Sequence, residues 1–128
     1  QMRYFAFYVK DTGRRNNSNA IIYGLYRMDI KGVETEISEG VENFQVQYGI
    51  DTSGNGSVDT FYKANTVNNL NLWPQVLSLK VSRLLTSINE IDNQNRPYFF
   101  NGTLQEATDR LIRREWANFI SLRNRSFP

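Results

Sequence analysis

The segment from Glu39 to Asp59 constrains the fold more than any other stretch of this sequence. Between Asn43 and Ile50, apolar and polar side chains alternate, which predicts a half-buried β-strand because successive side chains leave opposite faces of a strand. The apolar set is Phe44, Val46, Tyr48 and Ile50, and the polar set is Asn43, Gln45, Gln47 and Gly49. The strand leads into a loop, residues 51–59, that is rich in glycine and in oxygen-bearing side chains.

Length and composition narrow the class of protein. With 128 residues, of which 40% are hydrophobic and 13% aromatic, the chain is predicted to be a single soluble domain over residues 1–128. The mean hydropathy of −0.54 is too low for a membrane-embedded chain. The sequence has no cysteine and no histidine, so disulfides, thiolate or imidazole metal sites and Ser-His-Asp catalysis are unavailable. Catalysis would have to rest on carboxylates, Lys or Tyr, for example on Asp51 and Asp59 as a glycosidase-like acid/base pair. No substrate-binding motif accompanies these two residues, so we expect no enzyme activity.

Further strands are indicated by runs of β-branched and aromatic residues and, in 76–85 and 112–124, by alternation of apolar and polar residues. Lys31-Gly32 predicts a turn before 33–38, and the asparagine-rich residues 60–72 are predicted to be irregular. The predicted strands are 3–11, 20–29, 33–38, 76–85 and 112–124. A capping box at Thr103–Glu106 predicts a short helix that continues to Leu111. The expected fold class is α+β, mainly an antiparallel sheet. The predicted core consists of Phe44, Val46, Tyr48, Ile50, Leu77, Leu79, Val81, Trp116, Ile120 and Leu122.

The strands 3–11 and 20–29 carry apolar residues on both faces. Such strands are covered on both sides, either by a second sheet or by a segment that is missing from this sequence. Gly24 indicates a bulge or a close backbone approach within the second of these strands. The aromatic run Tyr98–Phe100 is either a docking patch or a loop packed onto the core.

The loop after the central strand has the spacing of the first part of a calcium-binding loop. Oxygen-bearing side chains stand at positions one, three, five and nine, and glycine stands at position six. The candidate Ca²⁺ ligands are Asp51, Ser53, Asn55, Ser57 and Asp59. Position twelve is Tyr62 instead of an acid, so a further carboxylate from Glu42 or Asp29 would be needed for more than a weak site. The alternative is a polar turn built on Gly54-Asn55-Gly56.

Five arginines lie close together near the C-terminus: Arg110, Arg113, Arg114, Arg123 and Arg125. They could contact phosphates, but neighbours on a strand point in opposite directions, and Asp109 and Glu115 are near enough to pair with them. The net charge of +2 is small. We expect a salt-bridged, solvated face and no binding of nucleic acid.

Four pieces of the chain resemble, in the right order, the PilW-type minor pilins of type IV pili, which are related to the J-class pseudopilins of type II secretion. The matching pieces are GLYRMD (24–29), EGVENFQVQYGIDTSGNGSVD (39–59), Trp73 followed by VLSLKVSRLLTS (76–87), and DRLIRREWANFISLRNR (109–125). Together they extend over roughly three quarters of the chain.

The resemblance implies a pilin-like fold in which a long N-terminal helix packs on the sheet and anchors the protein in the inner membrane. That helix is missing here, so the sequence is expected to be the C-terminal portion of a longer protein. The implied function is to initiate pilus assembly by packing with other minor pilins and with a tip adhesin, first at the periplasmic face of the inner membrane and then in the extracellular pilus. Such pili serve adhesion, twitching motility or DNA uptake. The alternative is a calcium-dependent carbohydrate- or surface-binding β-module.

Overall fold

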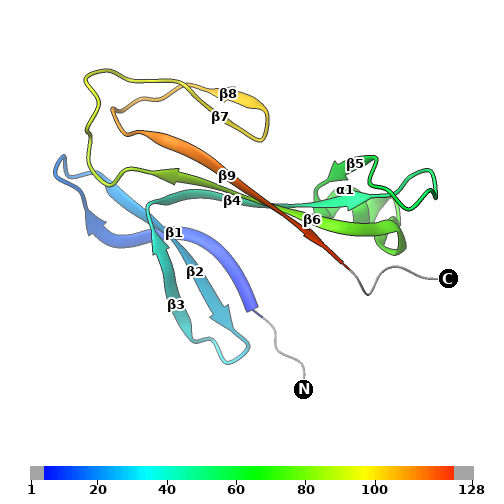
Figure 1. Cartoon of the computed structure of the whole chain (residues 1–128). Helices are drawn as coiled ribbons and strands as arrows, with labels where there is room; N and C mark the ends of the chain where they lie inside the picture. The colour runs from blue at the N-terminus through cyan, green and yellow to red at the C-terminus, as the bar shows by residue number, and fades with distance from the viewer. Residues whose placement is uncertain (1–4, 123–128) are drawn as a thin grey trace. The chain divides into compact units, whose positions relative to one another are not determined.

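The computed structural model describes residues 5–122, which are mostly β-strand (Figure 1). Its elements are β1 (Phe5–Arg15), β2 (Ile21–Asp29), β3 (Glu34–Glu39), β4 (Val41–Ile50), β5 (Thr60–Tyr62), α1 (Ala64–Asn69), a turn of 3₁₀ helix (Trp73–Gln75), β6 (Val76–Thr86), β7 (Tyr98–Phe100), β8 (Thr103–Gln105) and β9 (Arg113–Ser121). The strands form sheets in the orders β1-β2-β3, β5-β4-β6-β9 and β7-β8. The predicted predominance of antiparallel sheet is confirmed.

The described residues gather into two compact units, and the boundary between the units falls within β4, β6 and β9. The first unit contains residues 5–44 and 83–116, and the second contains residues 45–82 and 117–122. The single domain expected over residues 1–128 stays a prediction. Within the described part of the chain, 5–122, no helix is both long and apolar enough to cross a membrane.

In the first unit, β2 is the central strand of the sheet β1-β2-β3 and pairs antiparallel with both neighbours. Gly24 permits a close approach, because a Cβ atom there would lie 2.9 Å from Thr12 Cγ2 and 3.1 Å from the Ser38 carbonyl oxygen. The pairing of β2 with β3 also shifts register by one residue beside Leu25. The irregularity predicted at Gly24 is thus confirmed. β1 extends to Arg15, beyond the end predicted at Asp11.

One face of this sheet carries a row of ion pairs. The Tyr8 hydroxyl donates to Glu34, and Lys10 Nζ lies 2.6 Å from Glu34 Oε1. Arg14 donates from Nη1 and Nη2 to the two carboxylate oxygens of Glu36, at 3.0 and 2.6 Å. These pairs cross from β1 to β3 over the central strand, so they join the two edges of the sheet on one face.

The second unit contains a small core under α1. Val67 of α1, Ile50 of β4 and Val76 of β6 are almost completely buried, at 0%, 0% and 3% exposure. Four partly buried side chains surround them: Tyr48, Tyr62, Leu72 and Leu122. The sequence around α1 has no amphipathic repeat and predicted an irregular segment, so burial of Val67 is what holds this short helix.

The helix predicted from Thr103 to Leu111 is wrong. Residues 98–105 form a hairpin in which β7 and β8 are joined by Asn101 and Gly102, with φ angles of 52° and 77°. Two consecutive residues with positive φ make the tight turn that Asn-Gly favours, and this turn overrides the capping box. Asn-Gly between two short apolar runs was the signal for the hairpin.

The predicted core is confirmed for Ile50 and is wrong for Trp116 and Ile120, which are 51% and 46% exposed. The other predicted core residues are half-buried. On β6 the buried side chains are Val76, Ser82 and Leu84, whereas the prediction placed Leu77, Leu79 and Val81 inside. Alternation identifies a strand, but the elements that pack on it decide which face is covered.

Candidate functional site

The predicted calcium loop is a compact turn organised around Asp51. This carboxylate is 9% exposed and accepts backbone N–H groups from Gly54, Asn55 and Gly56, at 2.8, 3.2 and 2.8 Å. Gly54 and Gly56 have φ angles of 77° and 83°, which glycine adopts without a steric penalty. The hydrogen bonds, that from Gly56 above all, hold the pKa of Asp51 below its ordinary value.

Asp59 closes the loop from its other end. Its Oδ2 atom accepts the Thr52 hydroxyl at 2.9 Å and the N–H groups of Thr52 and Ser53 at 2.8 and 3.1 Å. These hydrogen bonds, led by the one from the Thr52 hydroxyl, lower the pKa of Asp59. Both carboxylates are therefore ionised at neutral pH and tie down backbone N–H groups that a loop would otherwise leave without partners.

The structure brings the candidate ligands into one loop. Asn55 accepts the N–H of Ser57 at 3.0 Å, and Ser53 Oγ lies 3.5 Å from Asp51 Oδ1. Position twelve, Tyr62, is paired with Tyr48 in the sheet. Across residues 5–122 there is no cluster of three or more Asp, Glu, His or Cys side chains suited to a metal ion. The two readings of this loop, a calcium site and a plain polar turn, both stay predictions.

The two acids that were considered as additional ligands have other partners. Glu42 accepts a forked pair of hydrogen bonds from Arg113. Asp29 accepts the N–H groups of Lys31 and Val33, both at 2.9 Å, in the turn between β2 and β3.

Exposed apolar side chains are numerous among the described residues. On the β1-β2-β3 sheet, Phe5 and Phe7 of β1 are 42% and 47% exposed, and Ile21 and Tyr23 of β2 are 38% and 37% exposed. The Phe7 ring contacts the Phe44 ring at 6.1 Å between centroids. The apolar residues predicted on both faces of these strands are thus partly uncovered, which is typical of surfaces that bind another protein.

The hairpin β7–β8 divides the aromatic run Tyr98–Phe100 between its two faces. Phe100 is buried at 7% exposure, and the guanidinium of Arg113 lies over the Tyr98 ring at 5.1 Å. On the other face Phe99 and Leu104 are paired across the strands and are 63% and 53% exposed. Two rings of this run therefore pack inward and one faces solvent, and docking of a partner on the exposed ring stays a prediction.

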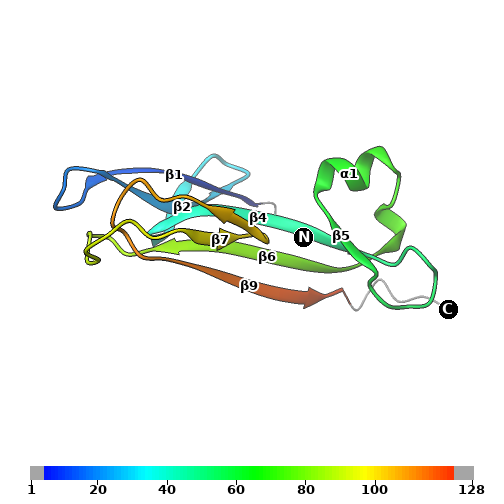
Figure 2. The ribbon, with the colours of Figure 1, turned by 90° about the horizontal axis from the view of Figure 1, so that it is seen from above.

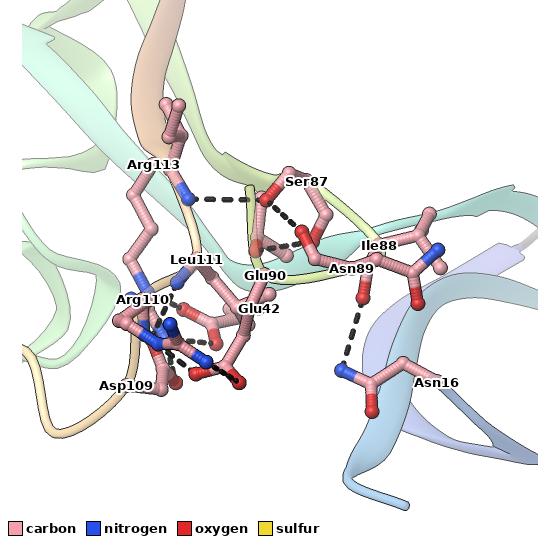
Figure 3. A network of polar contacts seen from close by, with 12 residues as sticks. Asn16, Glu42, Ser87, Ile88, Asn89, Glu90, Asp109, Arg110, Leu111 and Arg113 are labelled. Carbon is pink, nitrogen blue, oxygen red and sulfur yellow. Dashed lines mark hydrogen bonds and ion pairs between the residues drawn. The ribbon is translucent and has the colours of Figure 1, made fainter. Parts of the chain in front are cut away.

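A network of ion pairs holds the segment between β6 and β9 in the first unit (Figure 3). Arg113, whose side chain is only 7% exposed, lies 2.6 Å from Glu42 and 2.8 Å from Asp109. Arg110 Nη2 lies 3.3 Å from Glu90. Asn16 Nδ2 donates to the carbonyl oxygen of Ile88 at 3.1 Å. The pairing of Asp109 with a nearby arginine is as predicted. Sequence reasoning missed the contacts Arg110–Glu90, Arg113–Glu42 and Asn16–Ile88, because these residues are 20, 71 and 72 positions apart.

The basic cluster is dispersed in the way that the sequence predicted. Arg110 and Arg113 are paired with carboxylates, and the side chain of Arg113 is buried while Arg114 is exposed. Arg123 and Arg125 lie outside the described residues. The paired arginines stabilise the first unit and leave less positive charge for phosphates.

These features define a predominantly β protein that has ion pairs between its strands and loops and exposes apolar side chains to solvent. The comparison with known families then gives its kind: the family model described as type IV pilus-assembly protein W matches residues 6–124. The chain belongs to this family, and the resemblance to PilW-type proteins is confirmed. Membership assigns the chain a role in type IV pilus assembly and an association with the cell envelope or the pilus. No curated protein and no solved structure matches the chain.

Proposed function

We propose that this chain is the C-terminal part of a minor pilin that helps to initiate type IV pilus assembly by packing with other minor pilins and with a tip adhesin. Family membership over residues 6–124 supports the assembly role. The proposed location is the periplasmic face of the inner membrane before assembly and the extracellular pilus afterwards. A preceding N-terminal helix would anchor the protein in the membrane, as the resemblance implies.

The observation that carries the proposal is the exposed apolar pair on the hairpin β7–β8. Phe99 and Leu104 lie opposite each other and face solvent, while Tyr98 on the other face is held under Arg113. The hairpin is thereby fixed before any partner arrives, so binding does not have to order it. Burying a phenylalanine or leucine side chain contributes about 1.5–3 kcal/mol, enough for this pair to anchor a protein–protein contact.

The proposal is tested in cells that assemble the pilus, with the full-length gene deleted and replaced by variants. We expect the deletion, and the double variant Phe99→Ser/Leu104→Ser, to reduce surface pili strongly while the level of the major pilin in the membrane stays normal. The double variant should also recover less of the other minor pilins in pull-downs. Gln94→Ser, at an exposed polar position of the same segment, is the matched control and should behave like wild type.

Normal piliation in the deletion strain would contradict the proposed role in initiation. Normal piliation with the double variant alone would retain that role but remove the hairpin as its contact surface. Immunoblots of each variant are needed beside these measurements, because a degraded protein would also reduce piliation.

A further inference from the structure

The outer edge of β9 in the second unit is a strand edge with exposed residues. β9 is the terminal strand in the order β5-β4-β6-β9, and Figure 2 shows it running along the outside of β6. Residues 117–121 are all exposed, with Phe119 at 65% and Ile120 at 46%. A terminal strand presents backbone N–H and C=O groups that another strand can pair with.

One hydrogen bond shows which residues of this edge point outward. The N–H of Leu122 donates to the carbonyl oxygen of Leu77 at 2.9 Å, so Leu122 directs its backbone groups toward β6. Alternate residues of a strand direct these groups to the same neighbour. Asn118 and Ile120 therefore also face β6, whereas Ala117, Phe119 and Ser121 direct their backbone groups away from it.

This edge lacks the charges that protect the two edges of the sheet β1-β2-β3. β3 carries Glu34, Glu36 and Glu39, and β1 carries several charged side chains. Charges on an edge strand oppose pairing with a second chain. The sequence of residues 117–121, Ala-Asn-Phe-Ile-Ser, contains neither a charge nor a proline.

We propose that this edge pairs with the same edge of a second copy of the chain, antiparallel and about a two-fold axis at Phe119. We choose a second copy as the partner because residues 117–121 are complementary to themselves in this arrangement. Phe119 then stands opposite Phe119 of the second copy, and the small residues Ala117 and Ser121 stand opposite each other on either side. Asn118 stands opposite Ile120. All three outward-facing residues acquire backbone partners, and no like charges meet within residues 117–121.

The ring of Phe119 is already placed for this contact. The centroid of its ring lies 5.7 Å from that of Phe61, with an interplanar angle of 61°. A two-fold axis at Phe119 extends this pair into a row of four rings, two from each copy, and aromatic cross-strand pairs stabilise sheets. Lys80 Nζ, 5.9 Å from the Phe119 ring, lies on β6. The two copies of Lys80 would be about three strand spacings apart, roughly 14 Å, where salt screens their repulsion.

Sedimentation equilibrium of the chain from micromolar to millimolar concentration tests the proposal. The average mass should rise from 14.9 kDa toward twice that value. Ala117→Pro removes an outward N–H at an edge position, where proline is tolerated. Phe119→Lys places like charges opposite each other. Each should weaken association at least tenfold, whereas Leu70→Lys, at a 57% exposed residue beside α1, should associate like wild type.

A wild-type chain that stays monomeric throughout overturns the proposal. So does association of both edge variants with the wild-type affinity, because the contact would then use another surface. If either variant fails to fold, amide hydrogen exchange of the wild-type chain tests the edge pairing instead. The N–H groups of Ala117, Phe119 and Ser121 should exchange more slowly as concentration rises, and unchanged rates would again refute the pairing.

Discussion

The guanidinium of Arg113 holds the carboxylate of Glu42 in a fork, with Nε at 2.6 Å from Oε1 and Nη2 at 2.9 Å from Oε2. The two residues are 71 positions apart in sequence. The same guanidinium donates to both oxygens of Asp109 at 2.8 Å. The side chain of Arg113 is only 7% exposed, and its hydrogen bonds to Asp109 and Glu42 offset the cost of burying its charge and raise its pKa.

Removal of Arg113 should therefore destabilise the protein strongly. Arg113→Met leaves Glu42 and Asp109 facing each other without their shared cation, and breaking such a buried pair costs about 3–5 kcal/mol. Urea denaturation measures the loss in free energy of unfolding. Arg114→Met, at the exposed neighbour, is the control and should change it by less than about 0.5 kcal/mol. Equal effects of the two variants would contradict the role assigned to Arg113 and its partners Glu42 and Asp109.

Acid should unfold the protein partly through the Asp51 loop. The pKa of Asp51 is lowered from 3.8 by the backbone N–H groups that it accepts. Its ionised form therefore contributes stability that is present above the unfolded value of 3.8 and is lost as the pH falls through the lower folded value. Thermal melts between pH 7 and pH 2 should show a shallower acid dependence in Asp51→Asn than in wild type. An identical pH dependence in both proteins would show that the loop hydrogen bonds do not persist in solution.

Gly49 should not tolerate a side chain. A Cβ atom there would lie 2.3 Å from Ser78 Oγ and 3.0 Å from both Phe61 Cε1 and Val58 Cγ2. Gly49→Ala should lower the free energy of unfolding by about 1–3 kcal/mol, the usual cost of overpacking. The double variant Gly49→Ala/Ser78→Ala removes the closest clash, so its cost should be smaller than the sum of the two single costs. Strict additivity in the cycle would show that Ser78 moves away without penalty.

Thermal melts in millimolar Ca²⁺ and in EDTA decide between the two readings of the loop 51–59. Because its two carboxylates already accept backbone N–H groups and position twelve is Tyr62, we expect equal melting temperatures in the two buffers. Calcium binding would instead stabilise the folded protein by mass action and raise its melting temperature. The stabilisation is about 1.4 kcal/mol when the calcium concentration is ten times Kd. Asp59→Asn should abolish any such rise. A rise in wild type that this variant lacks would establish the calcium site.

The sequence by itself determined most of the strands and the pilus family. Alternation in residues 43–50 and 76–85 identified β4 and β6, and Lys31-Gly32 marked the turn before β3. These signals are local, because a strand half-buried in a sheet imposes period two on its own side chains. The loop after β4 could also be predicted from the sequence, because glycine and short polar side chains at residues 51–59 favour a turn with positive φ angles.

Only the tertiary structure decided which of these local options prevailed. Thr103–Glu106 satisfies a capping box, but pairing of β7 with β8 and burial of Phe100 made it a hairpin. Both faces of β6 carry candidate core residues, and packing of Val67 onto Val76 selected one of them at the end near α1. The partnership of Glu42 with Arg113 depends on a contact across 71 residues, and no local pattern records it. Burial and ion pairing are properties of the folded neighbourhood, whereas strand periodicity is a property of the chain itself.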